Sequence, residues 1–425
     1  MVNDVYAEVC SPRRLYAAWR YLRTASRSSQ WPRVRQEYHR IEEDPFGFIA
    51  SLSERLATGD FQFGKKFGYT KRKSGGSRRG IVVASLADRI VQRSILTTIT
   101  HPAEGTRQQV AGLHSVISAP TSMAGVPGRS IGEAVHLAHN VMKSGATHFT
   151  CSDVKSFYPF IPRVKINQII QTYITDDRFC DLFERAISTE LSNELELGQW
   201  LDLFPIKDKG VAQGSPLSVF CANLTLSDMD KRLNNANITT VRYLDDFLIL
   251  GASKRSVDEA FLQALEILDA DGMDAYRPRD GSQKAWSGLV ENGIDFLGCR
   301  VNSQNIGPSR RAKQALLSSI NDDIAKSKRA IYDVLHETAE LSNFSRKATV
   351  GATLIRTTAA TEGWSEAFNF CTNRLPFHQL QAQVYDIQRR YLGWSVRQSS
   401  KFSTEQWRRV WGGTEMASTS PRRPK

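Results

Sequence analysis

Two adjacent carboxylates, Asp245 and Asp246, stand between apolar β-forming residues in the segment 243–250 (YLDDFLIL). Neighbouring residues of a strand point to opposite faces, so a tight hairpin turn at the pair is the arrangement that presents both acids near one site. Leaving buried acids unpaired costs several kcal/mol, and a divalent cation removes that cost. A lone Asp-Asp pair is more often a surface turn, but the apolar flanks favour a buried site here.

A third acid, Asp153, lies in a similar apolar segment, residues 149–158, which we predict to be a strand. Two such strands side by side would gather three carboxylates, and carboxylate oxygens suit the hard cation Mg²⁺. Two such ions, about 3.5–4 Å apart, can activate a 3′-hydroxyl and stabilise a leaving pyrophosphate. The pattern therefore predicts a two-Mg²⁺ site for nucleotidyl transfer.

The loop at 210–218 (GVAQGSPLS) lies between these acids in the sequence, before a helical pattern at 217–233. Gln213 is a candidate contact to a base pair, and Gly214 permits close approach of the backbone because it lacks a side chain. The alternative for this segment alone is an ordinary glycine-containing loop before a helix.

The elements that must position these residues interleave strand and helix periods, which predicts an α+β fold. Beyond Gly307 and Pro308 the pattern is helical nearly to the end of the chain. The other expected elements are a helix at 11–24 that begins with Ser11 as N-cap and Pro12 at its first position, a basic hairpin at 61–83, a helix from Leu86 onward, a strand at 239–250, and helices at 312–341 and 375–392.

The composition favours polyanionic partners. The chain has 425 residues with 56 Lys and Arg against 44 Asp and Glu, a formal net charge of +12, although a merely basic surface gives the same balance. Six cysteines are scattered without zinc spacing, which favours a reducing cytoplasm over a disulfide framework. No apolar run reaches the length of a membrane span, so we expect a soluble intracellular protein with no membrane partner.

The segments resemble, in order, the sequence blocks of reverse transcriptases. YLDDFLIL is similar to their YxDD block, SDVKSFYPFIP to their first carboxylate block, and GVAQGSPLS to their PQG block, with Ala212 where most relatives have proline. SGGSRRGIVVASLADRIVQ at 74–92 resembles the fingers block, and GIDFLGCRVN at 293–302 resembles the primer-grip block. The resemblance covers roughly residues 60 to 302.

The resemblance implies a right-hand polymerase of α+β class, with a palm built on an antiparallel sheet. Its expected parts are an N-terminal helical extension at 1–60, fingers at 61–148, a palm at 149–307 with a fingers insertion around 160–210, a helical thumb at 308–412, and a basic disordered tail at 413–425.

The resemblance also implies roles for individual residues. Asp153, Asp245 and Asp246 would be catalytic and would hold two Mg²⁺ ions with the backbone carbonyl of Val154. Tyr158 would exclude a 2′-hydroxyl, and Lys284 is a candidate proton donor to pyrophosphate. The full nucleotide-binding set is Lys71, Lys73, Arg79, Tyr158, Gln213, Gly214 and Lys284, and the primer grip is Phe296, Leu297 and Gly298.

The implied activity is RNA-directed DNA synthesis from dNTPs, in which a structured non-coding RNA partner is copied into cDNA. Among bacterial classes, a stand-alone chain with a helical extension is similar to the defence-associated enzymes that act against phage. Alternatives are a retron enzyme, a group II intron enzyme and a non-catalytic RNA-binding relative. The segment 362–368 (EGWSEAF) vaguely resembles the thumb region of group II intron enzymes. An RNA-dependent RNA polymerase and a template-free terminal transferase also stay open, as do the primer and the oligomeric state.

Overall fold

The computed structural model describes residues 4–72, 76–206, 208–279, 284–336, 338 and 340–412. Two compact units make up the chain, Met1–Val290 and Glu291–Lys425. Lys73 and the tail at 413–425, which we expected to be disordered, lie outside the described residues. The fold is mixed α+β with antiparallel sheets, as predicted.

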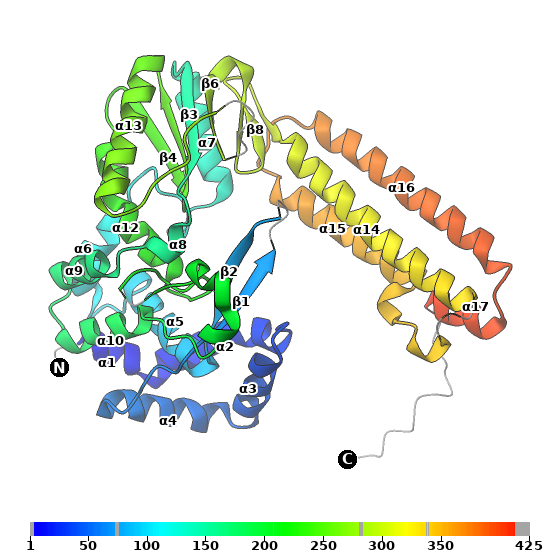
Figure 1. The fold of residues 1–425 in the computed structure, drawn as a ribbon, viewed down its shortest axis with the longest axis horizontal. Coiled ribbons are helices and arrows are strands. Elements are labelled where there is room, and N and C mark those ends of the chain that lie inside the picture. The colour runs from blue at the N-terminus through cyan, green and yellow to red at the C-terminus, as the bar shows by residue number, and fades with distance from the viewer. Residues whose placement is uncertain are drawn as a thin grey trace. The chain divides into compact units, whose positions relative to one another are not determined.

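The first unit opens with four helices, α1 (Val5–Cys10), α2 (Pro12–Arg27), α3 (Pro32–Glu43) and α4 (Pro45–Thr58) (Figure 1). The predicted start of α2 is confirmed, because Ser11 Oγ accepts a hydrogen bond from the backbone N–H of Arg14 and Pro12 is the first helical residue. Leu15 and Trp19 of α2 are buried against the rest of the unit.

A basic hairpin follows, as predicted. Strands β1 (Phe67–Arg72) and β2 (Arg78–Val83) are antiparallel. Ser85 then caps α5 (Leu86–Thr100), which packs against α2. Helices α6 (Arg107–Ile117) and α7 (Ile131–Lys143) lead into the central sheet.

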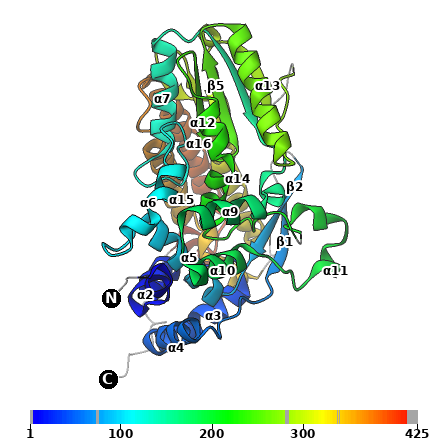
Figure 2. The same cartoon turned by 90° about the vertical axis from the view of Figure 1, so that its left-hand side faces the viewer.

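The central sheet has the order β4-β5-β3-β6 and is antiparallel throughout. Helices α7 and α13 (Lys254–Ala270) pack against it, and residues 247–250 of β5 have no solvent exposure (Figure 2). The strands are β3 (His148–Asp153), β4 (Ile238–Tyr243), β5 (Asp246–Gly251) and β6 (Ala285–Leu289).

Two predicted strands differ in their bounds from the strands of the structure. The expected strand at 149–158 was too long, because it ends at Asp153 and Ser156 adopts φ 45°, which turns the chain into the short helix α8 (Phe157–Phe160). The segment 239–250 is two strands, and the turn expected at the Asp pair is confirmed.

Helices between β3 and β4 complete this unit. The long α12 is buried on most of its surface, and Phe220 of α12 meets Phe183 of α10 edge-on at 6.1 Å between ring centroids. These elements are α9 (Arg163–Tyr173), α10 (Asp177–Ile187), α11 (Glu194–Leu197), the 3-10 helix η1 (Gly198–Leu203) and α12 (Ser218–Arg232).

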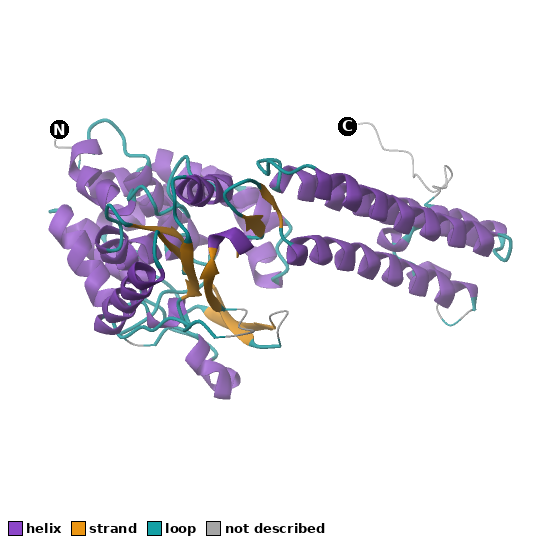
Figure 3. Cartoon of the chain, turned by 90° about the horizontal axis from the view of Figure 1, so that it is seen from above, coloured by secondary structure: helices purple, strands orange, loops and turns teal. Residues whose placement is uncertain are grey.

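The second unit begins at Glu291, within η2 (Val290–Asn292), with a small sheet and continues as helices (Figure 3). The expected helix at 312–341 ends at Leu335, and two 3-10 turns follow it. Inside the helices, Tyr391 Oη and Ser327 Oγ share a buried hydrogen bond of 2.6 Å. The elements are β7 (Ile294–Phe296), β8 (Cys299–Val301), β9 (Ile306–Pro308), α14 (Arg310–Leu335), η3 (Leu341–Asn343), η4 (Arg346–Ala348), α15 (Val350–Ala367), α16 (Leu375–Ser399) and α17 (Thr404–Trp411).

Of the helices in the described parts of the chain, none combines the length and the apolarity needed to cross a membrane. All six cysteines are free thiols.

Candidate active site

The structure brings the three predicted carboxylates to one end of the central sheet. Asp153 is the last residue of β3 and lies directly opposite Asp246, the first residue of β5. Asp245 occupies the two-residue turn that joins β4 to β5. The backbone N–H of Val154 donates to the carbonyl of Asp245 at 3.1 Å, which fixes the end of β3 against the turn.

Strained backbone marks this end of the sheet. Leu244, the first residue of the turn, has φ 59°, and Ser156, three residues after Asp153, has φ 45°. A residue with a side chain pays roughly 1–3 kcal/mol for such a conformation, and it persists only where its surroundings hold it. In the described parts of the chain, the third non-glycine residue with positive φ is Leu297, within the predicted primer grip.

The electrostatics of the acids are unfavourable on their own. Burial and the charges of Asp153 and Asp246 raise the pKa of Asp245 above its usual value. Asp246 is exposed as a residue, but partial loss of hydration and the nearby Asp153 raise the pKa of its carboxyl to about 6. Folding therefore holds like charges together.

Lys284 supplies the positive charge at this site. Its ammonium forms an ion pair with the carboxylate of Asp153, whose side chain is 12% exposed. Burial by itself lowers the pKa of Lys284, but the hydrogen bond and charge of Asp153 reverse this and hold the pKa above its usual value. The sequence placed Lys284 near the pyrophosphate, and the structure places it on a predicted metal ligand.

The donor set suits divalent metal. Within the described residues, no three acidic, histidine or cysteine side chains are gathered closely enough to form a metal cage by themselves. Mg²⁺ is usually held by one or two carboxylates with water and substrate phosphates, and it prefers oxygen ligands. Asp153, Asp245 and Asp246 are oxygen donors with an excess of negative charge, so their chemistry fits this ion.

A buried ion pair that the sequence analysis missed supports the turn. Arg242 precedes the YLDD segment, and its guanidinium makes bonds of 2.7 and 2.5 Å to the two carboxylate oxygens of Asp230 on α12. The same guanidinium donates to the carbonyl of Leu244 at 3.0 Å. Asn223 Oδ1 and Ser122 Oγ accept its remaining bonds, at 3.1 and 2.6 Å.

This network ties the strained turn to the core. Arg242 has no solvent exposure and Asp230 is 3% exposed, so the charges are compensated only by each other and by these polar partners. Arg242 touches no predicted substrate group, and we assign it as a positioning residue for Leu244 and thus for Asp245. The available signal in the sequence was an arginine among apolar residues of a predicted strand, together with an acid in the predicted helix before it.

A second support lies on the β6 side of β3, just beyond Ser152, the last residue of β3 that pairs with β6. Tyr276 N–H donates to the carbonyl of Asp153 at 3.1 Å, and Ser152 Oγ donates to the carbonyl of Tyr276 at 2.6 Å. Lys155 binds Asp274 through its side chain at 2.7 Å. Residues 274–276 therefore hold Asp153 from the side opposite Asp246, and no residue pattern in this segment indicated that role.

The loop that carries the predicted nucleotide-binding residues Gln213 and Gly214 connects Tyr158 to strand β2. Val211 N–H donates to the carbonyl of Tyr158 at 2.9 Å, and the carbonyl of Gln213 accepts from Val82 N–H at 3.1 Å. Burial and the charge of Asp245 raise the pKa of the Tyr158 hydroxyl to about 12, so it stays protonated. Gly214 has φ 112°, a conformation that favours glycine.

The predicted triphosphate-binding residues lie on the basic hairpin. Lys71 of β1 and Arg79 of β2 are cross-strand partners, and both are exposed. Lys73 lies outside the described residues. The predicted primer-grip residues Phe296, Leu297 and Gly298 belong to the second unit, where they form the turn from β7 to β8 and Gly298 O accepts from Ser309 N–H at 2.9 Å.

Residues 71–277, which contain these acids, the loop and most of the hairpin, match the reverse transcriptase (RNA-dependent DNA polymerase) family. The chain contains a reverse transcriptase domain. All three predicted catalytic carboxylates lie within this domain, as do Tyr158 and Gln213, whereas Lys284 and the predicted primer grip follow it.

The relatives of this reverse transcriptase domain are distant. An uncharacterized 91 kDa protein in a cob intron of Schizosaccharomyces pombe is 25% identical over 190 residues, which are 44% of this chain and 21% of that protein. A partial Cas6-RT-Cas1–Cas2 complex is 18% identical, with 64% of this chain and 44% of that chain covered and a TM-score of 0.36. Apo telomerase from Candida tropicalis, truncated from its C-terminal domain, is 14% identical, with 62% and 60% covered and a TM-score of 0.39. The chain therefore spans less than two thirds of each.

Proposed function

We propose that this chain is an RNA-directed DNA polymerase and that Asp153, Asp245 and Asp246 are its catalytic residues. One observation carries the proposal: two acids face each other across β3 and β5, and the third lies in the turn beside them. Two Mg²⁺ ions held by these carboxylates and the carbonyl of Val154 would activate the primer 3′-hydroxyl and stabilise the charge on the leaving pyrophosphate.

The remaining residues of the proposed site bind, orient and donate a proton. Arg79 and Lys71 contact the triphosphate, and the planar guanidinium of Arg79 suits bidentate phosphate binding. Tyr158 lies under the sugar and leaves no room for a 2′-hydroxyl. Gln213 positions the incoming nucleotide against the template base. Lys284 keeps its proton at Nζ because Asp153 raises its pKa, so it can donate that proton to pyrophosphate.

The physiological template in our proposal is a structured non-coding RNA, copied into cDNA during bacterial antiphage defence. The net charge of +12 supports an RNA partner. The helical unit that follows the catalytic domain supports a member of this class, which the helical extension resembles. A retron-type or group II intron-type enzyme is the second candidate, favoured by the segment 362–368.

A non-catalytic RNA-binding role is the rival from another class. It gives no reason to keep Asp245 and Asp246 beside Asp153, where burial and the repulsion from Asp153 raise the pKa of both residues and cost stability. Replacing them with neutral residues would stabilise a protein that only binds RNA. The retained acids therefore support catalysis.

Primer extension on an RNA template tests the proposed activity. Wild type should incorporate dNTPs in preference to NTPs and should require Mg²⁺ and the template. The double variant Asp245→Asn/Asp246→Asn should bind RNA with unchanged affinity and fail to extend the primer. Asp258→Asn is the matched control, because Asp258 lies on the exposed side of α13 in an ion pair with Lys254. Extension by the double variant would contradict the site, and NTP preference would favour RNA synthesis.

Sequencing of the nucleic acid that co-purifies with the protein tests the template. One abundant cDNA complementary to a structured RNA, present with wild type and missing with the double variant, is the expected result. Bound RNA without cDNA in phage-infected cells would contradict the proposed reaction and favour the RNA-binding rival.

A further inference from the structure

Two cysteines of the second unit lie in contact with each other. The Sγ atoms of Cys299 and Cys371 are 3.9 Å apart and buried, although the two residues are 72 positions apart in the sequence. Cys299 belongs to β8, and Cys371 lies in the connection between α15 and α16. Both are free thiols. The scattered spacing of the six cysteines gave no sign of this pair.

Hydrogen bonds hold together the two segments that carry these thiols. Cys299 lies in the middle strand of the small sheet β7-β8-β9. On the adjacent strand β9, Ile306 N–H donates to Thr372 Oγ1 at 2.9 Å, and the carbonyl of Ile306 accepts from Asn373 N–H at 2.9 Å. The two residues after Cys371 are therefore bound to the strand beside Cys299, and the fold keeps the two sulfurs within reach of each other.

The surroundings make one of the two thiols the easier to ionise. The hydrogen bond with Cys299 holds the pKa of the Cys371 thiol below its usual value; burial opposes this shift and the charge of Arg374 supports it. The same hydrogen bond, together with burial, raises the pKa of the Cys299 thiol well above its usual value. The thiolate is the nucleophile in thiol oxidation, so Cys371 is the sulfur that reacts first.

The position of Cys371 in the chain gives a small oxidant access to it. Cys371 is 2% exposed, whereas Cys299 has no solvent exposure. Residues 368–374 form no helix or strand, since α15 ends at Ala367 and α16 begins at Leu375. Such connections open locally at a lower cost in free energy than the helices on either side. A brief opening of this connection exposes the Cys371 sulfur and leaves β8 in place.

We propose that Cys299 and Cys371 are an oxidation site, at which hydrogen peroxide forms a reversible disulfide between them. The Cys371 thiolate attacks one oxygen of the peroxide and breaks the O–O bond, which gives a sulfenic acid and a hydroxide that takes up the proton lost by Cys371. The sulfur of Cys299 then displaces the hydroxyl of the sulfenic acid, and the Cys299 proton leaves with it as water. The two thiols lose two electrons and two protons in total, and the peroxide is reduced to two water molecules. A thiol reductant reverses the reaction by exchange.

The disulfide would restrain the predicted primer-grip turn. Leu297 and Gly298, with φ of 49° and 81°, come directly before Cys299. Phe368, at the end of α15, packs close to this turn, since a Cβ on Gly298 would lie 3.4 Å from the Phe368 ring. A covalent bond from Cys299 to the connection that follows α15 therefore fixes the turn at this contact. We expect slower primer extension from the oxidised protein, and only this consequence rests on the proposed function.

The test treats the reduced full chain with millimolar hydrogen peroxide, alkylates the remaining thiols and maps the digest by mass spectrometry without reduction. A peptide pair that joins Cys299 to Cys371 should appear with wild type and disappear after dithiothreitol. In Cys371→Ala the pair should be missing, and Cys299 should stay reduced. Cys180→Ala is the matched control, because Cys180 lies on α10 of the first unit and is the most exposed of the six thiols. This variant should form the disulfide as wild type does.

Thermal unfolding of wild type gives a second measurement that needs no variant. The oxidised protein should unfold at a temperature roughly 5–10 °C above that of the reduced protein, because a bond that closes a long loop restricts the unfolded chain. Two outcomes would overturn the proposal. One is that Cys299 and Cys371 both stay open to alkylation after peroxide treatment that oxidises Cys180, which would make them ordinary core thiols. The other is disulfides that join only other cysteines.

Primer extension by the same samples, after removal of the peroxide, separates this proposal from the proposed function. The extension rate of wild type should fall severalfold on oxidation and recover with dithiothreitol, whereas Cys371→Ala should extend at one rate throughout. Formation of the disulfide with an unchanged extension rate contradicts the restraint on the primer-grip turn. If the reduced wild type forms the disulfide but extends no primer, the polymerase is contradicted and the oxidation site stands.

Discussion

Two antiparallel pairs of strands in the first unit carry like charges directly opposite each other, and the signs differ. Asp153 faces Asp246 between β3 and β5, whereas Lys71 faces Arg79 and Arg72 faces Arg78 between β1 and β2. Like charges on facing strand residues destabilise a sheet. Neither arrangement stabilises the fold, so each is explained by a partner of opposite charge, metal ions for the acids and phosphates for the bases.

The surroundings of the two pairs differ, and this difference sets how much each costs. The acidic pair lies at the end of a buried sheet, where loss of hydration raises the pKa of Asp246 to about 6. The basic pair is exposed, so water and salt screen its repulsion. The acidic pair therefore lowers the stability of the fold, whereas the exposed basic pair lowers it little.

The largest effect should come from neutralising the acidic site. Asp245→Asn/Asp246→Asn should lower the primer-extension rate by about 10³-fold or more, because several kcal/mol of transition-state stabilisation by the metal ions is lost. The same variant should raise the free energy of unfolding by about 1 kcal/mol after allowance for solvent screening. Chemical denaturation measures this second quantity, and a destabilised double variant would show that the acids do not repel each other as inferred.

Breaking the buried pair behind the acidic site should have the next largest effect. Asp230→Ala leaves Arg242 charged and unpaired in the core, and we expect a loss of about 3–5 kcal/mol in the free energy of unfolding. Such a variant alone does not distinguish positioning from stability.

The double variant Asp230→Leu/Arg242→Met makes that distinction. Apolar residues of similar volume often restore the stability of a buried pair, so its unfolding midpoint should return close to wild type. The extension rate should stay low, because the Leu244 carbonyl has lost its donor and the turn that carries Asp245 is free to relax. Recovery of rate together with stability would show that Arg242 only stabilises the core.

The elements that depend on local residue patterns could be predicted from the sequence, whereas contacts between residues far apart in the chain could not. The turn at Asp245 and Asp246, the basic hairpin and the start of α2 at Ser11 and Pro12 follow from local residue patterns, and all are present. The end of β3 at Asp153 was missed, because the apolar run continues to Tyr158 and the positive φ of Ser156 leaves no signal in residue type.

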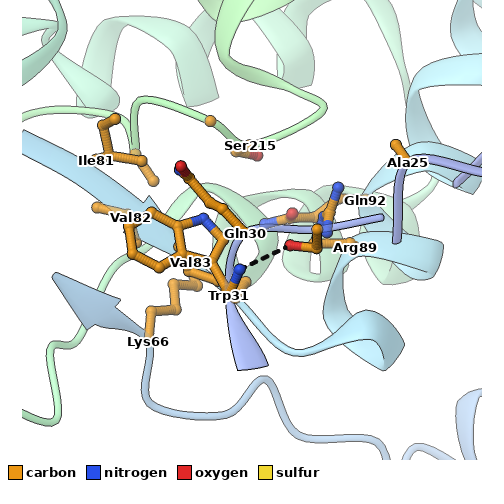
Figure 4. Close-up of a pocket in the computed structure, with 14 residues that line it drawn as sticks. Ala25, Gln30, Trp31, Lys66, Ile81, Val82, Val83, Arg89, Gln92 and Ser215 are labelled. Carbon is orange, nitrogen blue, oxygen red and sulfur yellow. Dashed lines mark hydrogen bonds between the residues drawn. The ribbon is translucent and has the colours of Figure 1, made fainter. Parts of the chain in front are cut away.

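Contacts between distant residues were the part that the sequence did not reveal. Asp230 and Arg242 are twelve residues apart on different elements, and neither belongs to a recognisable motif. The cavity beside the Gln213 loop is lined by residues that run from 25 to 215 along the chain (Figure 4). Such sites depend on tertiary packing, which periodicity along one segment does not encode.

A pH experiment asks whether the base of the basic hairpin also holds buried charge. Asp88 of α5 is 2% exposed and accepts from Gly64 N–H just before β1, and burial raises its pKa from 3.8 to about 6. A raised pKa means that the protonated form is favoured in the folded state, so this contribution is present below pH 3.8 and is lost as the pH rises through 6. The loss is at most about 3 kcal/mol.

Urea denaturation of wild type and Asp88→Asn between about pH 4.5 and 7 measures this contribution to the free energy of unfolding. The window brackets the Asp88 pKa of about 6. Wild type should lose stability relative to Asp88→Asn as the pH rises through this window. If the free energies of unfolding of the two proteins changed with pH in parallel, the Asp88 carboxyl would be hydrated and the base of the hairpin would hold no buried charge. Burial lowers the pKa of Lys66 to about 8, and the charge of Asp88 opposes this shift, so the pH window is kept below that value.

The smallest effect should come from the exposed tip of the basic hairpin, where Arg79 and Arg78 are adjacent and point to opposite faces. Arg79→Gln should raise the KM for dNTP about tenfold, in line with loss of one charge-assisted phosphate contact, and should change the free energy of unfolding by no more than about 0.5 kcal/mol. Arg78→Gln is the control, because Arg78 bonds to Thr70 Oγ1 at 2.7 Å and lies over the ring of Trp200. Its loss should leave the KM close to wild type. If the two variants raised the KM equally, the triphosphate would be attracted by the net charge of the hairpin, and the role of Arg79 as a specific phosphate ligand would be wrong.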